Sequence, residues 1–483
     1  MLEKHYRIIM IGLLFCLLFW IASCAVNPVS GGRELMLLSE SQEIELGRKT
    51  DGQVVRQYGL YEDEKFTEYL NGFCRRLGKL SHRPNLNYQF KIVDTATVNA
   101  FAVPGGYIYF TRGILAHLNN EAEVVGVIGH EMGHITARHS AQQYTRAQFA
   151  QVGLGLGMIL SETVRSFGDL AQFGVGMLFL RFSRDNERQA DDLGVEYASK
   201  AGYDASQMAN FFDTLERMHA KSDRSGLPDW FSTHPNPIDR QATVRKRATG
   251  WQRKLGVNNL KIDRDQYLRR IDGLVYGEDP RQGYVEQGVF YHPVLKLQFP
   301  VPSKWKLENT RSFVRMVSER KDAAILFSLS SARSPKEAAQ SFVSKNKATV
   351  IESGRGNVKG LSAYRMISQV RSSKGAVQIM SYFIQKDNKV YVFHGFSALS
   401  SFDRYRDTFE GTMTQFRNLS DSKKLNVKPS RIRIRSTRAA GSMRQALRSL
   451  GVPADKLKEL AVLNGKHLDE NVPANTLLKI VAK

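Results

Sequence analysis

Two histidines lie four positions apart in the stretch VIGHEMGH, and a glutamate directly follows the first of them. On a helix, residues i and i+4 share one face, so His130 and His134 could direct their imidazole nitrogens at a single ion. Glu131 is turned about 100° around the helix axis, where it could act on a water bound to that ion. A catalytic zinc ion takes three protein ligands and keeps a fourth position open. The pattern therefore predicts a zinc site and requires a third ligand from elsewhere.

Glu187 is the candidate third ligand. It lies in NERQADDLGVEY, which has a helical pattern, and Asp191 follows four residues later on the same face. Glu187 could complete the metal site, while Asp191 could act on it from behind the ligands. Three glycines, Gly126, Gly129 and Gly133, interrupt the first helix at a cost of about 1 kcal/mol each relative to alanine. They predict close packing, or room for a metal and a substrate.

Helices and short strands are expected around these candidate ligands. Ser39 is expected to cap a helix at its N-terminus, and Gly202 is expected to end another at its C-terminus. Pro104-Gly105-Gly106 separates two strand pieces. Helices are predicted after Ser39 and over residues 64–80, 121–150 and 184–200, and strands over residues 87–93 and 100–110.

The pattern changes at about Gln282. Alternating stretches such as AAILFSLSS and KVYVFHGFS predict an antiparallel sheet, with helices around residues 335–347 and 402–417. A polar linker follows, and the tail from Arg431 predicts a strand, two helices and a strand. The predicted fold class is therefore multidomain α+β, with a first large domain that is mostly helical and carries a small edge sheet.

The chain has 483 residues and a formal net charge of +22. Single cores stop growing at about 250–300 residues, so several domains are expected. The positive charge is spread along the chain and favours anionic neighbours such as acidic lipid or cell-wall polymer. No nucleic-acid-binding motif accompanies it, so nucleic acid is not predicted as a partner. Of three cysteines, Cys74 lies alone in the body of the chain and is expected to be a buried apolar residue.

The N-terminus has a basic start, an apolar run and small residues before a cysteine. The run is shorter than the roughly 20 residues that span a bilayer, which favours a cleaved signal peptide. Ile21-Ala22-Ser23-Cys24 resembles the lipobox of bacterial lipoproteins, which implies a signal peptide over residues 1–23 and a lipid on Cys24. Ala25 then favours sorting to the outer membrane. The predicted location is the cell envelope, lipid-anchored and facing the periplasm; the alternative is an ordinary secreted protein.

Five segments follow one another in the first half of the chain: SCAVNPVSGGRELMLLSESQEIELG, NAFAVPGGYIYFTRGIL, NEAEVVGVIGHEMGHITARHS, SRDNERQADDLGVEYASKAGYD and STHPNPIDR. Together they resemble the M48 family of zinc metallopeptidases, and within it the bacterial lipoprotein members. The resemblance covers about residues 24–250. It implies a gluzincin-like fold with one zinc ion per chain, held by His130, His134 and Glu187. It also implies Glu131 as the general base that takes a proton from the water and delivers it to the leaving amine.

The same resemblance assigns roles around the metal. It implies that Asp191 orients a ligand histidine. The stretch from Asn99 to Val103 resembles the family's edge strand beside the cleft, so Asn99, Ala100 and Phe101 are expected to bind an extended peptide through main-chain hydrogen bonds. Such binding reads the backbone before the side chains. Loosely selective cleavage of unfolded chains is therefore expected.

His234 in STHPNPIDR matches a family position near the metal, and two roles are open. It could stabilise the tetrahedral oxyanion, or it could close the fourth coordination position and keep the enzyme latent; the alternative is a loop histidine that caps local backbone. Arg240 could pair with the substrate carbonyl or buttress the loop. His139 follows His134 by five residues, which points it away from the metal face of a continuous helix, so a structural role is expected.

The tail resembles a degenerate LysM module through LAVLNGKHLDENVPANTLLKIV, although AAGSMRQAL replaces the usual opening. It could contact peptidoglycan or serve as a basic adaptor domain. The expected parts are a signal peptide (1–23), a lipidated N-terminus and tether (24–38), an M48-like peptidase domain (39–255), an α+β accessory domain (256–420), a linker (421–430) and the LysM-like module (431–483).

These observations predict a zinc-dependent endopeptidase of the bacterial cell envelope that hydrolyses misfolded or misassembled envelope proteins. One alternative is a zinc-binding chaperone or assembly factor whose site His234 blocks. A second alternative is a peptidoglycan-associated scaffold whose main work is done by the tail.

Overall fold

The chain forms two compact units in this computed structural model. The first contains Met1–Val55, Gly59–Gly277 and Arg431–Ala482, and the second contains Arg56–Tyr58, Glu278–Ser430 and Lys483. Several sheets and many helices agree with the predicted multidomain α+β class. The structure describes residues 24–154, 181–219, 230, 233–234, 239–372 and 375–483.

No helix within those ranges is long and apolar enough to cross a bilayer. The predicted signal peptide over residues 1–23 lies outside them. The first unit opens with a hairpin of β1 (Cys24–Val26) and β2 (Arg33–Leu35). α2 (Glu40–Tyr58) follows, and Ser39 and Gln42 form a capping box at its start, which confirms the predicted N-cap. α3 (Glu64–Leu80) spans the predicted residues and buries the free thiol of Cys74, as expected.

A three-stranded sheet lies ahead of the candidate metal ligands. β3 (Gln89–Val93) runs parallel to the central β5 (Tyr107–Thr111), and β4 (Ala100–Val103) pairs with β5 in the antiparallel direction. The two predicted strand pieces are thus confirmed. Gly105 and Gly106 form the turn between them with φ of 82° and 102°, a region that favours glycine. β4 is an outer strand of this sheet, and α4 (Arg112–His117) follows β5 directly.

The single helix predicted over residues 121–150 is wrong. α5 (Glu121–Thr136) ends, and α6 (His139–Leu154) begins three residues later. Arg138 adopts a left-handed φ of 57° between them, which interrupts the helical hydrogen bonds. Its Nε donates to Glu43 Oε2 at 2.8 Å and its Nη2 donates to the Leu38 carbonyl at 2.8 Å. Long-range partners therefore hold the corner, and no local pattern announces it.

α9 (Arg184–Lys200) packs closely along α5. A Cβ on Gly129 would lie 3.0 Å from the Gly194 Cα, and a Cβ on Gly194 would lie 2.8 Å from the His130 nitrogen. A Cβ on Gly133 would meet Ala190 at 3.0 Å. Of the two expectations for these glycines, the structure shows close packing. The remaining helices of this half are α10 (Gln207–His219), α12 (Arg240–Leu255) and α13 (Arg264–Arg270).

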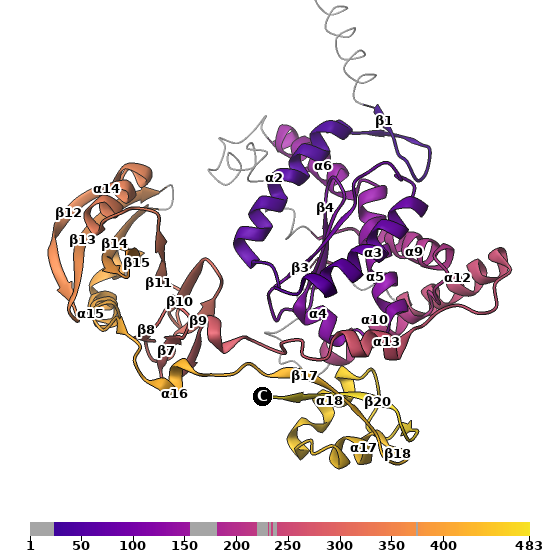
Figure 1. The fold of residues 1–483 in the computed structure, drawn as a ribbon. Coiled ribbons are helices and arrows are strands. Elements are labelled where there is room, and N and C mark those ends of the chain that lie inside the picture. The colour runs from indigo at the N-terminus through magenta and orange to yellow at the C-terminus, as the bar shows by residue number, and fades with distance from the viewer. Residues whose placement is uncertain (1–23, 155–180, 220–229, 231–232, 235–238, 373–374) are drawn as a thin grey trace, which may run out of the picture. The chain divides into compact units, whose positions relative to one another are not determined.

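The tail belongs to the same compact unit as the first half of the chain. β17 (Arg431–Ser436) pairs with β20 (Leu477–Ala482), in the predicted order with two helices between them. The tail packs against α10 and α13 (Figure 1), and its apolar side chains join the first half's hydrophobic core. Lys479 is fully buried and donates to the Ala116 and Leu118 carbonyls at 2.8 and 2.9 Å. The intervening elements are β18 (Gly441–Ser442), α17 (Met443–Ser449), α18 (Leu457–Leu463) and β19 (Asn471–Val472).

The second unit is built on a seven-stranded antiparallel sheet, in the order β12-β13-β14-β15-β11-β10-β9. On β15, Phe393 faces a core shared with α15, whereas Val392 faces α14 on the other side of the sheet. A smaller sheet has the order β16-β8-β7-β6. The bounds are β6 (Tyr284–Glu286), β7 (Val289–His292), β8 (Leu297–Pro300), β9 (Lys306–Asn309), β10 (Phe313–Val317), β11 (Ala323–Ser330), α14 (Pro335–Asn346), β12 (Thr349–Val358), β13 (Leu361–Ser372), β14 (Gly375–Lys386), β15 (Lys389–Ala398), α15 (Phe402–Met413), β16 (Arg417–Asn418) and α16 (Ser422–Leu425).

Candidate metal centre

Four side chains from three parts of the first unit converge on one point. His130, His134, Glu187 and His234 each bring one ligand atom within 4.8 Å of the others. The two Nε2 atoms of His130 and His134 are 3.2 Å apart. Glu187 Oε1 lies 3.5 Å from His134 Nε2, and its Oε2 lies 3.8 Å from His130 Nε2. The structure therefore brings the three predicted ligands together, and His234 joins them.

The atoms of this cluster fit a metal ion. Both carboxylate oxygens of Glu187 and the Nε2 of His234 are buried without a hydrogen-bond partner. Buried polar atoms are normally paired, and an unpaired buried carboxylate is costly. Burial raises the pKa of Glu187 well above its usual value, against the opposing charge of Arg240. Nitrogen ligands about 2 Å from one tetrahedral ion lie about 3.3 Å apart, close to the observed separation of the two imidazoles.

Asp191 contacts His130, the first predicted ligand histidine, as its predicted orienting role requires. Its Oδ1 accepts a hydrogen bond from His130 Nδ1 at 2.8 Å, which directs His130 Nε2 into the cluster. Arg240 donates to both Asp191 oxygens, from Nε at 2.8 Å and from Nη2 at 2.7 Å. Burial alone would raise the pKa of Asp191, but the Arg240 charge and the hydrogen bond from His130 lower it below its usual value. Asp191 therefore stays ionised.

Arg240 is buried behind the ligands. Its guanidinium lies over the Phe212 ring at 3.9 Å, and its Nη2 is 3.5 Å from Glu187 Oε2. This position makes Arg240 the counter-charge of Asp191, a role that lay outside the alternatives considered from the sequence, because 49 residues separate the two. Its predicted pairing with a substrate carbonyl stays a prediction.

Glu131 lies beside the cluster and is 1% exposed. Its Oε1 is 3.5 Å from His234 Nε2, and neither carboxylate oxygen has a hydrogen-bond partner. Burial raises the pKa of Glu131 to about 8, against the opposing charge of Arg240. A carboxylate whose pKa lies near neutrality suits a general base, because it accepts and returns a proton at working pH.

His234 is held by the residues just before it. Its ring stacks on Trp230 with centroids 4.3 Å apart, and its backbone nitrogen donates to the Trp230 carbonyl at 2.8 Å. The Thr233 hydroxyl donates to the Trp230 carbonyl at 3.1 Å, so it can accept from His234 Nδ1, which is 2.8 Å away. Nε2 then presents a lone pair to the cluster and no proton. Of the two predicted roles, this arrangement favours the metal ligand over the oxyanion donor.

His139 does not point away from the metal face, contrary to the expectation for a continuous helix. Arg138, with its left-handed φ, ends the regular helical spacing between the two histidines, and His139 Nδ1 lies 2.9 Å from His134 Nδ1. On its other side, His139 Nε2 lies 2.9 Å from Gln189 Oε1. Sequence reasoning missed both His139 and Gln189. The corner depends on Glu43, 95 residues away in sequence, so no local signal points to them.

The predicted substrate strand lies at the edge of the small sheet, next to α5. Ala100 pairs with Phe110, and Phe101 stacks on Tyr109 with ring centroids 4.9 Å apart. Asn99 precedes the strand, and its side-chain oxygen is buried without a partner. This placement is compatible with peptide binding, and the substrate role of Asn99, Ala100 and Phe101 stays a prediction.

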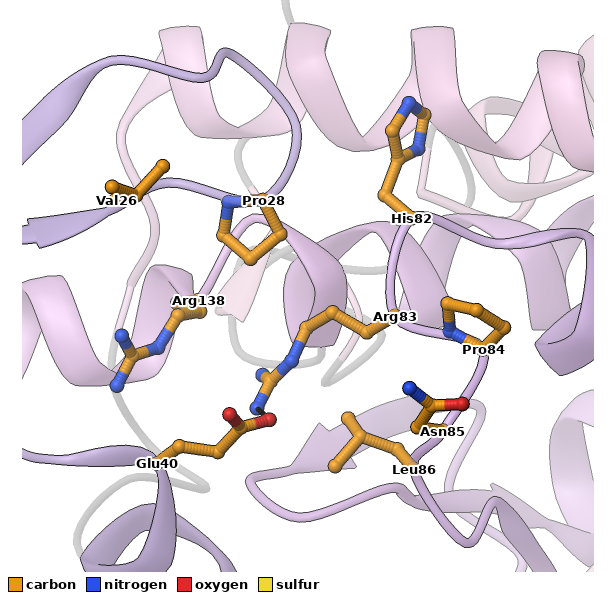
Figure 2. A pocket seen from close by; sticks show the side chains of 9 residues that line it. All are labelled: Val26, Pro28, Glu40, His82, Arg83, Pro84, Asn85, Leu86 and Arg138. Carbon is orange, nitrogen blue, oxygen red and sulfur yellow. Dashed lines mark hydrogen bonds and ion pairs between the residues drawn. The ribbon is translucent and has the colours of Figure 1, made fainter.

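A cavity of about 260 Å³ lies away from the cluster, beside the corner between α5 and α6. Figure 2 shows Glu40, Arg83 and Arg138 around it. Arg83 donates to Glu40 at 2.9 Å, to Glu43 at 3.0 Å and to the Ile135 carbonyl in the last turn of α5 at 3.1 Å. These charged groups already satisfy one another. They hold the C-terminal end of the helix that carries the candidate ligands His130 and His134, which is a structural role.

Two histidines of an HExxH motif on one helix, together with a glutamate from a later helix, form a metal-binding set that is typical of metalloproteases. Residues 64–248 match the model of peptidase family M48, a range that runs from α3 into α12 and contains the four converging residues.

Named proteases are similar to this region. Beta-barrel assembly-enhancing protease of Escherichia coli (strain K12) is 29% identical over 220 residues, which are 44% of this chain and 45% of that protein. Mitochondrial metalloendopeptidase OMA1 of Schizosaccharomyces pombe is 31% identical over 220 residues, 44% of this chain and 63% of that protein. Metalloprotease YcaL of Escherichia coli is 29% identical over 192 residues, 38% of this chain and 71% of that protein. The chain spans less than half the length of the beta-barrel assembly-enhancing proteases that it matches.

Proposed function

We propose that this chain is a zinc-dependent endopeptidase of the bacterial cell envelope. The observation that carries the proposal is the buried convergence of His130, His134 and Glu187, with Glu131 beside them. The M48 match over residues 64–248 supports the same class. A zinc ion held by these three ligands would supply a Lewis acid for the scissile carbonyl and would lower the pKa of a bound water toward about 7.

The chain's own residues then divide the work. Glu131 takes a proton from the attacking water and delivers it to the leaving amine, which its raised pKa favours. Asp191, kept ionised by Arg240, holds the Nδ1 proton of His130 and thereby the orientation of that ring. The edge strand at Ala100 and Phe101 binds the substrate main chain, so peptide sequence matters less than an extended, accessible backbone.

We infer the substrates and the location from the comparisons and the N-terminal pattern. The name of the Escherichia coli relative refers to β-barrel assembly, which supports misfolded or misassembled envelope proteins as substrates. The lipobox resemblance supports lipidation of Cys24, a periplasm-facing protein and sorting to the outer membrane. The membrane would then be a partner through the lipid.

The test is hydrolysis of fluorescent casein by the purified full chain, with and without a zinc chelator, beside Glu131→Gln. We expect the chelator to stop cleavage and added zinc to restore it. Glu131→Gln should lower the rate by about 10²–10⁴-fold while zinc content stays unchanged, because only the base is lost. Glu68→Gln, at an exposed position on α3, is the matched control. Equal cleavage by the Glu131→Gln protein and an active wild type removes Glu131 from the mechanism.

A latent zinc-binding chaperone or assembly factor is the second candidate function. It is favoured by the burial of the whole cluster, because Glu131 and the four converging residues are each at most 2% exposed. His234→Ala separates the two readings. If His234 closes the site, the variant should cleave casein faster than wild type; if His234 stabilises the oxyanion, the variant should be slower. The chaperone function is supported if the wild type and Glu131→Gln suppress aggregation of an unfolded protein equally well and neither of them cleaves casein.

Peptidoglycan contact through residues 431–483 stays a prediction. It is supported by the strand-helix-helix-strand order and the basic composition of the tail. Because the tail shares the core of the first unit, deleting it would disturb the peptidase region as well. Co-sedimentation of the full chain with purified sacculi, beside the double variant Arg444→Glu and Arg448→Glu, is the appropriate test. Equal retention of both proteins would remove the scaffold hypothesis.

A further inference from the structure

We propose that His139 and Gln189 are positioning residues for the zinc ligand His134. A chain of hydrogen bonds that runs from a ligand histidine to a residue of α9 is called an arm below: the first arm joins His130 to Asp191, and the second joins His134 through His139 to Gln189. The inference rests on the proposed zinc function and goes beyond it, because it assigns the orientation of the second ligand histidine to two specific residues. Neither residue touches the reacting atoms.

The two ring nitrogens of His134 have different surroundings. Nε2 faces the cluster, 3.2 Å from His130 Nε2 and 3.5 Å from Glu187 Oε1. Nδ1 lies 2.9 Å from His139 Nδ1. If Nε2 is the metal ligand, the ring proton must be on Nδ1, since a neutral imidazole carries one. His134 therefore donates this hydrogen bond and His139 accepts it.

The direction of the next hydrogen bond follows from the first. Because His139 Nδ1 accepts, its ring proton is on Nε2, which donates to Gln189 Oε1 at 2.9 Å. If the Gln189 amide were turned the other way, its NH2 group would face the His139 Nε2 proton, and two donors cannot hydrogen-bond. Metal coordination by His134 Nε2 therefore determines both the tautomer of His139 and the orientation of the Gln189 amide. His139 is completely buried. The Phe182 ring stacks on His134 with centroids 4.1 Å apart, and lies 6.1 Å from His139, so it covers the pair.

Both arms end at residues of the same helix, α9. On α9, Glu187 supplies a ligand, Gln189 ends the arm from His134 and Asp191 ends the arm from His130. The arms differ in charge: one ends on a carboxylate paired with Arg240, and the other on a neutral amide. A carboxylate partner raises the basicity of a metal-bound imidazole more than an amide does. The arm through Gln189 should therefore be the weaker one and should respond to a carboxylate placed there.

The experiment measures zinc affinity of the full chain by competition with a chromophoric chelator. His139→Phe keeps an aromatic ring but removes the acceptor, and we expect about 10–100-fold weaker zinc binding. Gln189→Leu should also weaken it, whereas Gln189→Glu should bind zinc at least as tightly as wild type. The absorption bands of the cobalt-substituted protein should shift in Gln189→Glu. His117→Phe is the control, because His117 is a buried histidine of the same unit that bonds the Gly113 carbonyl.

The outcomes separate this inference from the function on which it rests. A wild-type chain that binds no zinc overturns the proposed function. A wild type that binds one zinc ion, with equal affinity in His139→Phe, overturns the positioning role alone. If His139→Phe does not fold, the zinc affinities of Gln189→Leu and Gln189→Glu test the positioning role instead, because Gln189 is only half-buried. A lower affinity for Leu than for Glu supports the arm, and equal affinities refute it.

Discussion

The two compact units differ in where they hold charge. Burying a charge is costly unless it is paired, so a unit with many buried charges needs a reason to keep them. In the second unit, the fully buried charged residues within the described ranges are Asp279 and Lys386. The first unit buries Glu43, Arg83, Arg112, Glu121, Glu123, Glu131, Arg138, Glu187, Asp191, Arg240 and Lys479. Four of these buried charges, on Glu131, Glu187, Asp191 and Arg240, lie at the candidate metal centre, where ion pairs and hydrogen bonds hold the candidate ligands.

The second unit keeps its charge on the surface. Residues 278–430 contain 25 Lys and Arg against 13 Asp and Glu, so this stretch carries more than half of the net charge of +22. The positive charge is spread along the chain, but it is denser in this stretch than in residues 1–277. The interior is aromatic instead, with Phe299, Phe327 and Phe393 in mutual contact. The difference teaches that chemistry in this chain should depend on the first unit alone.

The largest effect should come from removing a ligand. Glu187→Ala should reduce the zinc content from about one ion per chain to almost none, because a buried site with two imidazoles alone binds weakly. Elemental analysis of the purified protein measures this. Glu410→Ala, at a glutamate of the second unit that bonds Tyr382, should leave the zinc content unchanged. A Glu187→Ala protein that still carries one zinc ion would place the metal elsewhere and break the comparison.

Acid should not weaken the metal-free first unit more than the second, although more histidines are buried there, because raised carboxyl pKa values oppose the histidines. Burial raises the pKa of Glu123 to about 7 and that of Glu131 to about 8, so the folded chain binds these protons before the unfolded chain does and stability rises as the pH falls. Burial lowers the pKa of five histidines of the first unit below the unfolded value of about 6.5, so between pH 6.5 and 4 the unfolded chain binds more protons at these five groups, which lowers stability as the pH falls. Each histidine whose pKa is lowered to about 4 reduces the free energy of unfolding by roughly 2 kcal/mol at pH 5. The pKa is lowered to about 4 at His117 and His139 in the first unit and at His292 and His394 in the second; it is also lowered at His130, His134 and His234.

Hydrogen exchange at pH 7 and pH 5, read separately for peptides of each unit, measures this difference. Protection in α5 and α9 should fall no further than protection in β14 and β15, because the opposing carboxyl groups lie in the first unit. A much larger loss in α5 and α9 would show that the raised pKa values of Glu123 and Glu131 do not offset the histidines.

Sequence reasoning succeeded where the signal is local and failed where it is not. The N-cap at Ser39 and the turn at Gly105-Gly106 depend on neighbouring residues, and both were predicted. The helix that carries Glu187 and Asp191 follows from spacing alone. The break at Arg138 depends on Glu43, far away in sequence, and its consequence is the misplaced His139. The placement of Arg240 against Asp191 likewise depends on tertiary packing.

Each unit has a buried lysine, and substitution of these two lysines should have an effect of intermediate size on the free energy of unfolding. Lys479 donates to two carbonyls and lies near Glu123 in the first turn of α5; burial raises the pKa of Glu123 and lowers that of Lys479. Lys479→Met should cost about 3 kcal/mol, because it leaves those groups buried without their partner. Lys386 instead donates to the Leu295 carbonyl and pairs with the exposed Asp387, so Lys386→Met should cost less. Denaturant unfolding of both variants checks the order, and similar losses would contradict it.

The smallest effect should come from one added methyl group at the helix crossing. A Cβ on Gly194 would lie 2.8 Å from the His130 nitrogen, so Gly194→Ala should push α9 from α5 and move Glu187 away from the imidazoles. Alanine is favoured over glycine inside a helix by about 1 kcal/mol, so a net loss of stability would show that packing outweighs propensity.

Gly395→Ala is the counterpart in the second unit, where a Cβ would lie 2.6 Å from Phe409. Both variants should lose about 1–3 kcal/mol, as overpacked cores do. Only Gly194→Ala should also weaken zinc binding, because only that crossing sets the distance between the ligands. Chelator competition beside thermal unfolding tests this, and a loss of zinc affinity in Gly395→Ala would mean that the two units are not independent in function.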